Sequence, residues 1–105
     1  MIKYQYGFEK LYDAMYALIS NSDQKSRLKK AFGEIWLLEE TDLSEKKYYK
    51  LNELNKSLSR VKKNEGYYID DTLNEIDSDE INEHCQTILE MFIKTSKERD
   101  KSLSQ

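Results

Sequence analysis

The sequence predicts an all-α protein, a small helical bundle of four main helices plus a short helical turn. Three observations support this fold class. The 105-residue chain has no proline and only three glycines, and both residues are rare inside helices. Charged residues make up 35% of the chain, above the roughly 25% of an average domain. Apolar residues also recur at intervals of three and four, which is the spacing of one helix face.

The first helix is expected from Phe8, where the apolar positions repeat without a break. We expect all of them, Tyr12 included, to form its core stripe: Phe8, Leu11, Tyr12, Met15, Leu18 and Ile19. Asn21 or Ser22 can cap a second helix, whose inner face carries Leu28, Phe32, Ile35 and Leu38. Gly33 lies within that helix at a cost of about 1 kcal/mol relative to alanine, which a close helix crossing would explain.

The third helix is expected after a capping box formed by Asp42 and Glu45, with Ser44 as the other candidate cap. A narrow apolar seam follows along it, formed by Leu51, Leu54, Leu58 and Val61. A short helical turn then directs three apolar side chains inward: Ile69, Leu73 and Ile76.

The last helix begins at a second capping-box spacing, Asp77 with Glu80. Its apolar face is the broadest in the chain, so we expect it to be the central helix, with Met91 at the margin of that face. The face comprises Ile81, Cys85, Ile88, Leu89, Phe92 and Ile93. We expect one domain, 1–105, with an ordered core at about 8–97 and a frayed tail, 98–105, because the tail has almost nothing to bury.

The composition argues against several functions. With one cysteine, Cys85, and one histidine, His84, a zinc site would have to be built from carboxylates, which suit zinc poorly. Adjacent helical residues point about 100° apart, so His84 and Cys85 are badly placed as a base and nucleophile. The acidic residues of 70–80 lack the spacing of an EF-hand, and no phosphate-binding glycine loop is present. We therefore expect no enzymatic activity, metal or cofactor.

No segment of the sequence has the character of a membrane anchor. The start, "MIKYQYGFEK", has no apolar signal region, and the longest apolar run, "AMYALI", is far shorter than the roughly 20 residues that span a bilayer. We expect a cytoplasmic protein that does not contact membranes.

Charges are strongly segregated along the chain. Residues 46–63 contain seven basic residues and one acidic residue, whereas 64–93 contain nine acidic residues and no lysine or arginine. One interpretation is that the third and last helices pack as neighbours with opposite charges facing each other. Another is a dipolar surface that docks a partner or a second copy.

Tyrosines suggest where such a surface lies. The chain has eight, and two neighbouring tyrosines on a helix cannot both point inward, so some should be exposed as interface residues. Together with the adjacent basic residues, they define the predicted partner-binding site: Tyr48, Tyr49, Lys56, Arg60, Lys63, Tyr67 and Tyr68.

The order of motifs also resembles a known group. "FEKLYDAMYAL", then "SRLKKAFGEIWLL" followed by "TDLS", then "NEGYYIDDTLNEI" and a final amphipathic helix resemble a loose group of small all-helical bacterial proteins of unassigned function. That group is associated with mobile elements and defence-type gene neighbourhoods. The resemblance brings no active-site residues. It implies an accessory subunit or regulator that works with another protein.

Together these observations favour a non-enzymatic protein–protein interaction module. It would act as a homo-oligomer or as a small accessory or regulatory subunit of a larger bacterial complex. The alternative is a nucleic-acid-associated regulator that uses the basic face of the third helix, although no recognition motif accompanies that face. The basic residues in question are Lys46, Lys47, Lys50, Lys56, Arg60, Lys62 and Lys63.

Overall fold

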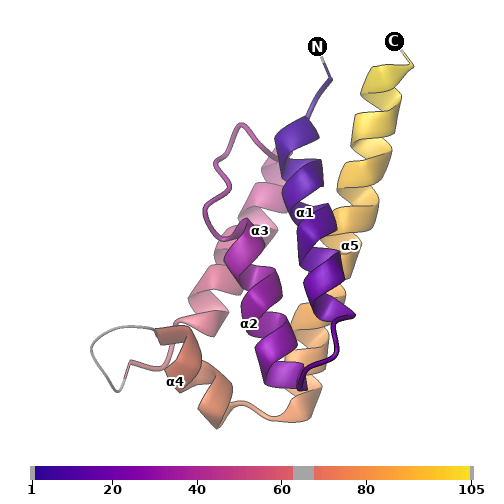
Figure 1. Ribbon diagram of the computed structural model, residues 1–105. Coiled ribbons are helices and arrows are strands. Elements are labelled where there is room, and N and C mark those ends of the chain that lie inside the picture. Colours follow the sequence, from indigo (N-terminus) through magenta and orange to yellow (C-terminus); the bar gives the residue numbers. More distant parts are fainter. Residues whose placement is uncertain (1, 63–67, 105) are drawn as a thin grey trace.

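The computed structural model of the protein describes residues 2–62 and 68–104, and every regular element in these ranges is a helix. The five helices are α1 (Gln5–Leu18), α2 (Gln24–Ile35), α3 (Glu45–Leu58), α4 (Tyr68–Glu75) and α5 (Ser78–Leu103). They form an elongated bundle of 48 × 27 × 20 Å. Both chain ends lie at one end of the bundle, and the short α4 lies at the other (Figure 1). The predicted small all-α bundle is confirmed. Within the described residues, no helix combines the length and hydrophobicity needed to cross a membrane.

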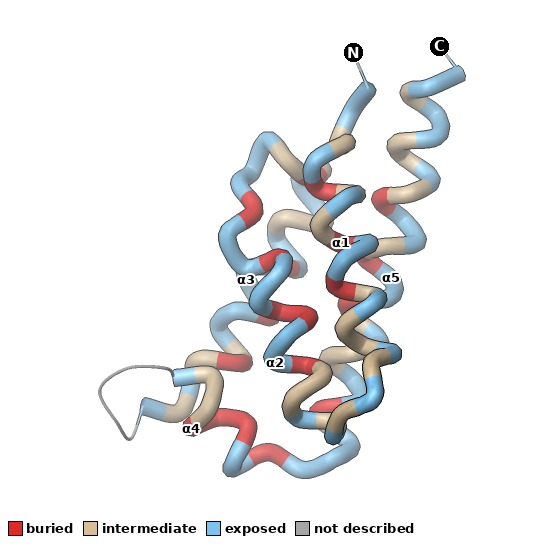
Figure 2. The backbone as a smooth tube through the Cα atoms, viewed as in Figure 1, coloured by how far each residue is buried: buried red, intermediate tan, exposed pale blue. Residues whose placement is uncertain are grey.

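The central helix of the bundle is α1. It packs most extensively against α2 and next against α5, and it runs beside both (Figure 1). Its buried side consists of Gly7, Leu11 and Ala14. Figure 2 shows the buried positions concentrated where the helices face one another. We expected the last helix to be central; α5 does pack against α1, α2 and α3, but each of these contacts is less extensive than the one between α1 and α2.

One continuous core joins all five helices and the segment before α3. Its buried apolar side chains are Leu11, Ala14, Leu28, Ala31, Phe32, Ile35, Leu38, Leu43, Leu51, Leu54, Leu58, Leu73, Ile76, Ile81, Ile88 and Met91. The inward orientation predicted for Leu73 and Ile76 is confirmed, and Ile69 packs against the same core. Met91, expected at the margin of α5, is instead almost completely buried.

The start of α2 differs from the prediction. Asp23, rather than Asn21 or Ser22, is the N-cap, and its Oδ1 accepts a hydrogen bond from the Ser26 backbone N–H at 2.9 Å. Asp23 has the extended backbone angles of an N-cap. Its short side chain places the carboxylate where it can accept a hydrogen bond from one of the free N–H groups of the first turn.

The two predicted capping boxes have different outcomes. Asp77 caps α5, since its Oδ1 accepts from the Glu80 N–H at 2.8 Å. Asp42 does not cap α3, because its Oδ2 accepts from the Glu39 N–H at 2.8 Å and stabilises the preceding turn instead. Ser44 is the N-cap of α3, and its hydroxyl donates to Glu98 on α5 at 3.4 Å.

The end of α5 also differs from the prediction. We expected the helix to end near Lys97, but it continues to Leu103. Arg99 holds this extension against α1: its Nε donates to Gln5 Oε1 at 2.7 Å, and its guanidinium lies 4.4 Å from the centre of the Phe8 ring. The hydrogen bond and the cation–π contact give the polar end of α5 a partner on α1.

The close approach expected at Gly33 occurs at Gly7. A Cβ added to Gly7 would clash with the backbone carbonyl oxygen of Asp42 and would lie 2.9 Å from Leu43 Cδ2. Gly33 is exposed, and an added Cβ would meet no atom within 4 Å. The absence of a side chain at position 7 therefore lets the segment before α3 lie directly on α1.

This contrast gives opposite expectations for the two alanine variants. Gly33→Ala should raise the free energy of unfolding by about 1 kcal/mol, because alanine is the better helix former and meets no obstacle. Gly7→Ala should lower it by more than about 1 kcal/mol, because the backbone at Asp42 must move. Urea unfolding followed by circular dichroism measures both. Equal effects of the two substitutions would contradict the assignment of the close contact to Gly7.

Two buried threonines provide a second matched pair. Thr72 and Thr95 are both completely buried. Thr72 Oγ1 accepts a hydrogen bond from the Val61 N–H at 3.1 Å. Thr95 Oγ1 has no hydrogen-bond partner in the described part of the chain.

Valine has nearly the same shape as threonine but no hydroxyl. Thr95→Val should therefore raise the free energy of unfolding by about 1 kcal/mol, because it removes a buried polar atom without a partner. Thr72→Val should lower it by about 1–2 kcal/mol, because it leaves the Val61 N–H unsatisfied. Urea unfolding again measures both, and a destabilising Thr95→Val would show that its hydroxyl does have a partner in solution.

Candidate interaction surface

The predicted partner-binding tyrosines lie in different environments. Tyr48 is half-buried and packs against the core, whereas Tyr49 is 65% exposed. Tyr68 begins α4 and is also exposed, with Lys62 Nζ 5.3 Å from its ring centre. The other two predicted site residues, Lys63 and Tyr67, lie outside the described residues.

Tyr49 and Tyr68 line separate hollows. Tyr49 lies at a polar groove of about 380 Å³ between α3 and α5, together with Glu53 and His84. Tyr68 lines a more apolar hollow of about 320 Å³ between α2, α3 and α4, together with Gly33 and Trp36. The structure therefore does not bring the predicted tyrosines into one cavity.

Arg60 of the predicted site is part of an ion pair within the chain. Its guanidinium donates to both carboxylate oxygens of Glu80, at 2.6 and 2.8 Å. His84 Nε2 lies 3.0 Å from Glu80 Oε2, one helical turn along α5. The Arg60 hydrogen bonds, with a smaller effect from His84, lower the pKa of Glu80 to about 2. The Arg60–Glu80 ion pair therefore connects the basic segment, residues 46–63, to the acidic segment, residues 64–93.

Other basic side chains of the 46–63 segment also have acidic partners. Lys47 Nζ lies 3.4 Å from Glu98 on α5, and this pair is largely shielded from solvent. Lys56 Nζ lies 3.5 Å from Glu53 on the same helix, and that pair is exposed. Lys47–Glu98 is therefore the ion pair that joins α3 to α5 as the interpretation of opposite charges on these helices expects, whereas Lys56–Glu53 lies within α3.

The single histidine and cysteine do not form a reactive pair. His84 contacts Glu80, while the half-buried Cys85 has its thiol pKa raised by burial. A raised pKa keeps the thiol protonated and weakly nucleophilic at neutral pH. Among the described residues, no group of three or more histidine, cysteine or acidic side chains could hold a metal ion.

An exposed row of aromatic rings runs along α1. Phe8, Tyr12 and Tyr16 follow one another at intervals of four, so they lie on one side of the helix. The Phe8 and Tyr12 ring centres are 6.2 Å apart, and those of Tyr12 and Tyr16 are 5.2 Å apart. The two tyrosine hydroxyls lie 3.3 Å from each other, and this hydrogen bond raises the pKa of Tyr12. The expectation that Tyr12 belongs to the core was wrong, because its side chain is 45% exposed.

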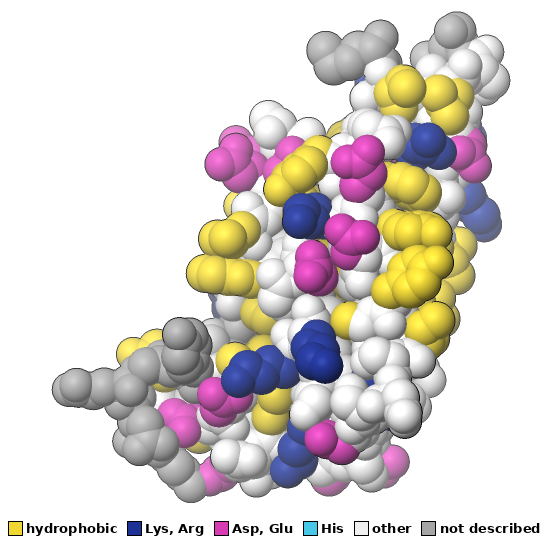
Figure 3. All heavy atoms as spheres, viewed as in Figure 1, with side chains coloured by type: hydrophobic (Ala, Val, Ile, Leu, Met, Phe, Trp, Pro, Cys, Tyr) yellow, Lys and Arg dark blue, Asp and Glu magenta, His cyan; other side chains and the backbone are white. Residues whose placement is uncertain are grey.

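The aromatic row continues onto α5 through Phe92. Its ring stacks on Phe8 with the centres 5.7 Å apart and lies 6.2 Å from the centre of Tyr12. Leu89 and Ile93 lie on the side of Phe92 that faces away from the core; we expected both in the core, but both are exposed. Hydrophobic side chains gather in a column along α1 on its α5 side (Figure 3).

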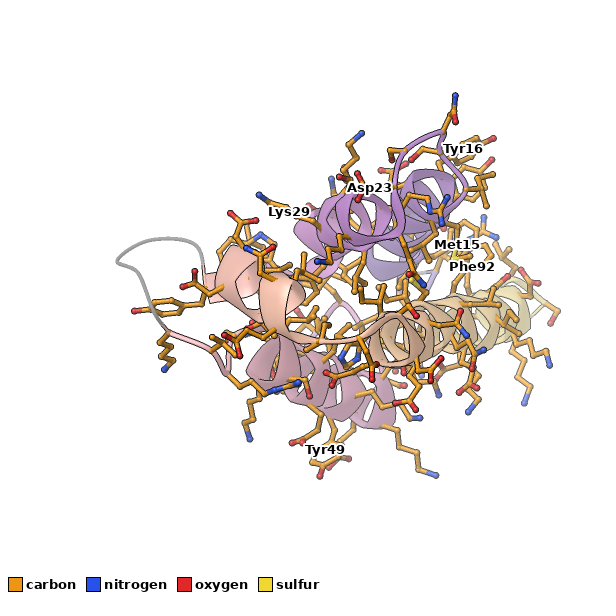
Figure 4. The ribbon with its side chains drawn as sticks, turned by 90° about the horizontal axis from the view of Figure 1, so that it is seen from below. Met15, Tyr16, Asp23, Lys29, Tyr49 and Phe92 are labelled. Atoms are coloured by element: carbon orange, nitrogen blue, oxygen red, sulfur yellow. The ribbon has the colours of Figure 1, made fainter. Side chains whose placement is uncertain are left out.

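We call this surface the α1–α5 face. It consists of the exposed or half-buried side chains of Phe8, Tyr12, Met15, Tyr16, Ile19, Leu89, Phe92 and Ile93. Figure 4 shows Met15, Tyr16 and Phe92 on one side of the molecule and Tyr49 on the other. The face is therefore distinct from the surface that the sequence predicted.

A signal for this face is present in the sequence of α1. The row containing Phe8 and Tyr12 lies about 100° around the helix from the buried row containing Gly7 and Leu11. Two adjacent apolar rows make a stripe wider than one or two neighbouring helices can cover. An apolar stripe of this width indicates that one of its two rows stays exposed, which the helical periodicity alone does not show.

Comparison with known proteins adds no relative to this description. No protein-family model, curated protein or solved structure matches the chain.

The Arg60–Glu80 pair makes the stability of the fold depend on pH. The pKa of Glu80 falls from 4.5 to about 2 on folding, so the ionised carboxylate stabilises the folded state above pH 4.5, and this contribution is lost as the pH falls toward 2. Glu80→Gln should lower the Tm by about 4 °C at pH 7. The difference from the wild type should shrink between pH 4.5 and pH 2.

Thermal unfolding of both proteins across this pH range measures the effect. Glu53→Gln is the control, because the Glu53–Lys56 pair is exposed on both sides and should change the Tm by less than about 1 °C. A Tm difference for Glu80→Gln that stays constant down to pH 2 would rule out the ion pair as its cause.

Proposed function

We propose that the protein is a non-enzymatic protein-interaction module that self-associates through the α1–α5 face. The observation that carries this proposal is the continuous set of aromatic and aliphatic side chains that two helices leave outside the core. The largest apolar patch on the surface of a protein is often a functional contact site.

The composition of the face suits a binding surface. Tyrosine and phenylalanine supply large contact areas with few rotatable bonds, and they are enriched where proteins meet. The ring contacts among Phe8, Tyr12 and Phe92 already restrict these side chains in the free protein. Binding therefore costs less side-chain entropy than it would with isolated rings.

The size of the face indicates the strength of the association. α1 is about 21 Å long and two adjacent helices are about 20 Å wide, so the face covers roughly 400 Å² per copy in projection. Two such faces would bury about 800 Å² in total, which is below the range of stable specific interfaces and fits only a weak, transient association. We expect a dimer that dissociates in the micromolar range, about 1–100 µM.

A second copy is the occupant that best fits the charges around the face. The exposed charged residues around the face have both signs: Glu9 and Asp13 on α1, and Glu90, Lys94, Lys97 and Asp100 on α5. A surface that carries charges of both signs can bind another copy of itself.

The alternative role, nucleic-acid binding by the basic segment, has less support. Lys47, Lys56 and Arg60 each pair with a carboxylate in the described part of the chain. Each pair would have to be broken before its cation could contact a phosphate. Steep salt-dependent binding of a labelled duplex or single strand would favour this alternative.

Sedimentation velocity over a concentration series tests self-association. The wild type should convert from monomer to dimer in the micromolar range, and Tyr16→Gln combined with Ile93→Gln should shift the midpoint to at least about tenfold higher concentration, because buried apolar area is lost. Leu37→Gln combined with Tyr49→Gln is the matched control, since both residues are exposed apolar side chains outside the face.

Two results would contradict the proposal. A wild type that stays monomeric at all concentrations would exclude self-association. The remaining role would be that of an accessory subunit, whose partner is a different protein. A control variant that weakens the dimer as much as the face variant would place the interface elsewhere.

A further inference from the structure

We propose that the hollow between α2, α3 and α4 is a binding site for a small, flat aromatic molecule that carries one anionic group such as a carboxylate. The hollow has a volume of about 320 Å³, which is at the lower end of the range of ligand-binding pockets. None of the described residues that line it belongs to the α1–α5 face. The inference is therefore independent of the proposed self-association.

One wall of the hollow is a single stripe of α2 and its C-cap. Lys29, Gly33 and Trp36 line the hollow at intervals of four and three residues, so they lie on one side of the helix. Along the helix axis, Gly33 lies about 6 Å from Lys29 and about 4.5 Å from Trp36. The middle of this wall is therefore bare backbone between a cation and an aromatic ring.

The glycine in this wall serves no close contact within the described chain. Glycine destabilises the interior of a helix relative to alanine, yet a Cβ added to Gly33 would meet no described atom within 4 Å. No neighbouring helix therefore requires a glycine at this position. An occupant of the hollow does benefit from it, because a flat ring can lie directly on the backbone where no side chain projects.

The rings around the bare backbone suit a flat aromatic occupant. Trp36 is 50% exposed, and Tyr68 at the start of α4 is 40% exposed, although both line the hollow. Phe32, Leu58 and Ile69 supply further apolar lining. Aromatic rings pack on one another in offset-stacked or edge-to-face geometry. The accessible rings at the hollow therefore favour an aromatic ligand over an aliphatic chain.

The boundaries of the hollow fit a small molecule better than a helix of a partner. Lys29 lies on the side of α2 that faces α4 (Figure 4), and its Nζ is 2.7 Å from Asp70 Oδ1. This ion pair joins α2 to α4 at one end of the hollow. A docked helix is about 10–12 Å in diameter and needs a long open groove, whereas a molecule of one or two fused rings does not.

The charges at the hollow favour an anionic group on the ligand. Among the described residues that line it, Lys29 is the only charged one. Asp70 offsets that charge, but Lys62 adds a second ammonium, 5.3 Å from the centre of the Tyr68 ring. When its ring covers Gly33, a flat aromatic acid can direct its carboxylate toward Lys29, one helical turn away.

The probe for this site is 2-naphthoate, an aromatic carboxylate with two fused rings. Two control ligands have the same ring system: 2-naphthamide is neutral, and 2-naphthylmethylammonium is positively charged. Each is titrated into the ¹⁵N-labelled protein and followed by NMR. Trp36 is the single tryptophan of the chain, so one indole N–H resonance reports on one wall of the hollow, and the backbone amide of Gly33 reports on the middle of that wall.

Naphthoate should shift both resonances until they saturate, with a dissociation constant of about 0.1–1 mM. The neutral amide should bind at least about threefold more weakly, and the ammonium at least about tenfold more weakly, because neither is attracted to the lysines. Shifts that do not saturate would overturn the proposal. It would also be overturned if the amide or the ammonium bound as tightly as naphthoate.

Gly33→Leu tests where the probe binds. The leucine side chain enters open space in the hollow, and leucine is a better helix former than glycine, so this variant should fold at least as stably as the wild type. It should bind naphthoate at least about tenfold more weakly, as followed by the Trp36 indole resonance. Asn82→Leu is the matched control, because Asn82 is exposed on α5 and does not line the hollow, and it should bind like the wild type.

Two further results would overturn the site. One is a folded Gly33→Leu variant that binds naphthoate as tightly as the wild type, with helix content checked by circular dichroism. The other is weaker naphthoate binding by the variant with Tyr16→Gln and Ile93→Gln, because this would place the probe on the α1–α5 face. Neither result bears on self-association, which sedimentation velocity measures without any ligand.

Discussion

The close contact between Gly7 and the backbone of Asp42 determines how the rest of the bundle is arranged around α1. Because no side chain separates them, the segment before α3 lies directly on α1. Leu43 of that segment joins the core from this position. With α2 and α5 also packed against α1, its buried side is reduced to the row that contains Leu11 and Ala14. The next row around the helix is left at the surface.

The aromatic side chains of that outer row stabilise one another rather than the core. Phe8 stacks on Phe92, Tyr12 contacts both of these rings, and Arg99 covers the edge of the cluster. An apolar surface built in this way is ordered before any partner arrives, so that binding need not rearrange the core. The core of the bundle and the proposed interface therefore share α1 and α5 but use different sides of each helix.

The charged residues divide into two groups with different consequences. Lys47–Glu98 joins α3 to α5, and Arg60–Glu80 joins the residues just after α3 to the first turn of α5. The charges at the borders of the α1–α5 face have no such ion-pair partners among the described residues. Among the ion pairs between described residues, only Arg60–Glu80 joins the basic segment 46–63 to the acidic segment 64–93.

The sequence alone determined the features that depend on neighbouring residues. Helical periodicity, the inward side of α4 and the Asp77 cap of α5 are set by spacings of one to four residues and were predicted correctly, whereas the cap of α2 was assigned to the wrong neighbour. Features that depend on which surface a helix meets were not. On α1 the rows of Leu11 and Tyr12 are both apolar, and on α5 the same is true of Ile88, which is buried, and Leu89, which is exposed. Periodicity cannot choose between two apolar rows 100° apart on the same helix; only the positions of the neighbouring helices decide which row is buried and which remains available for binding.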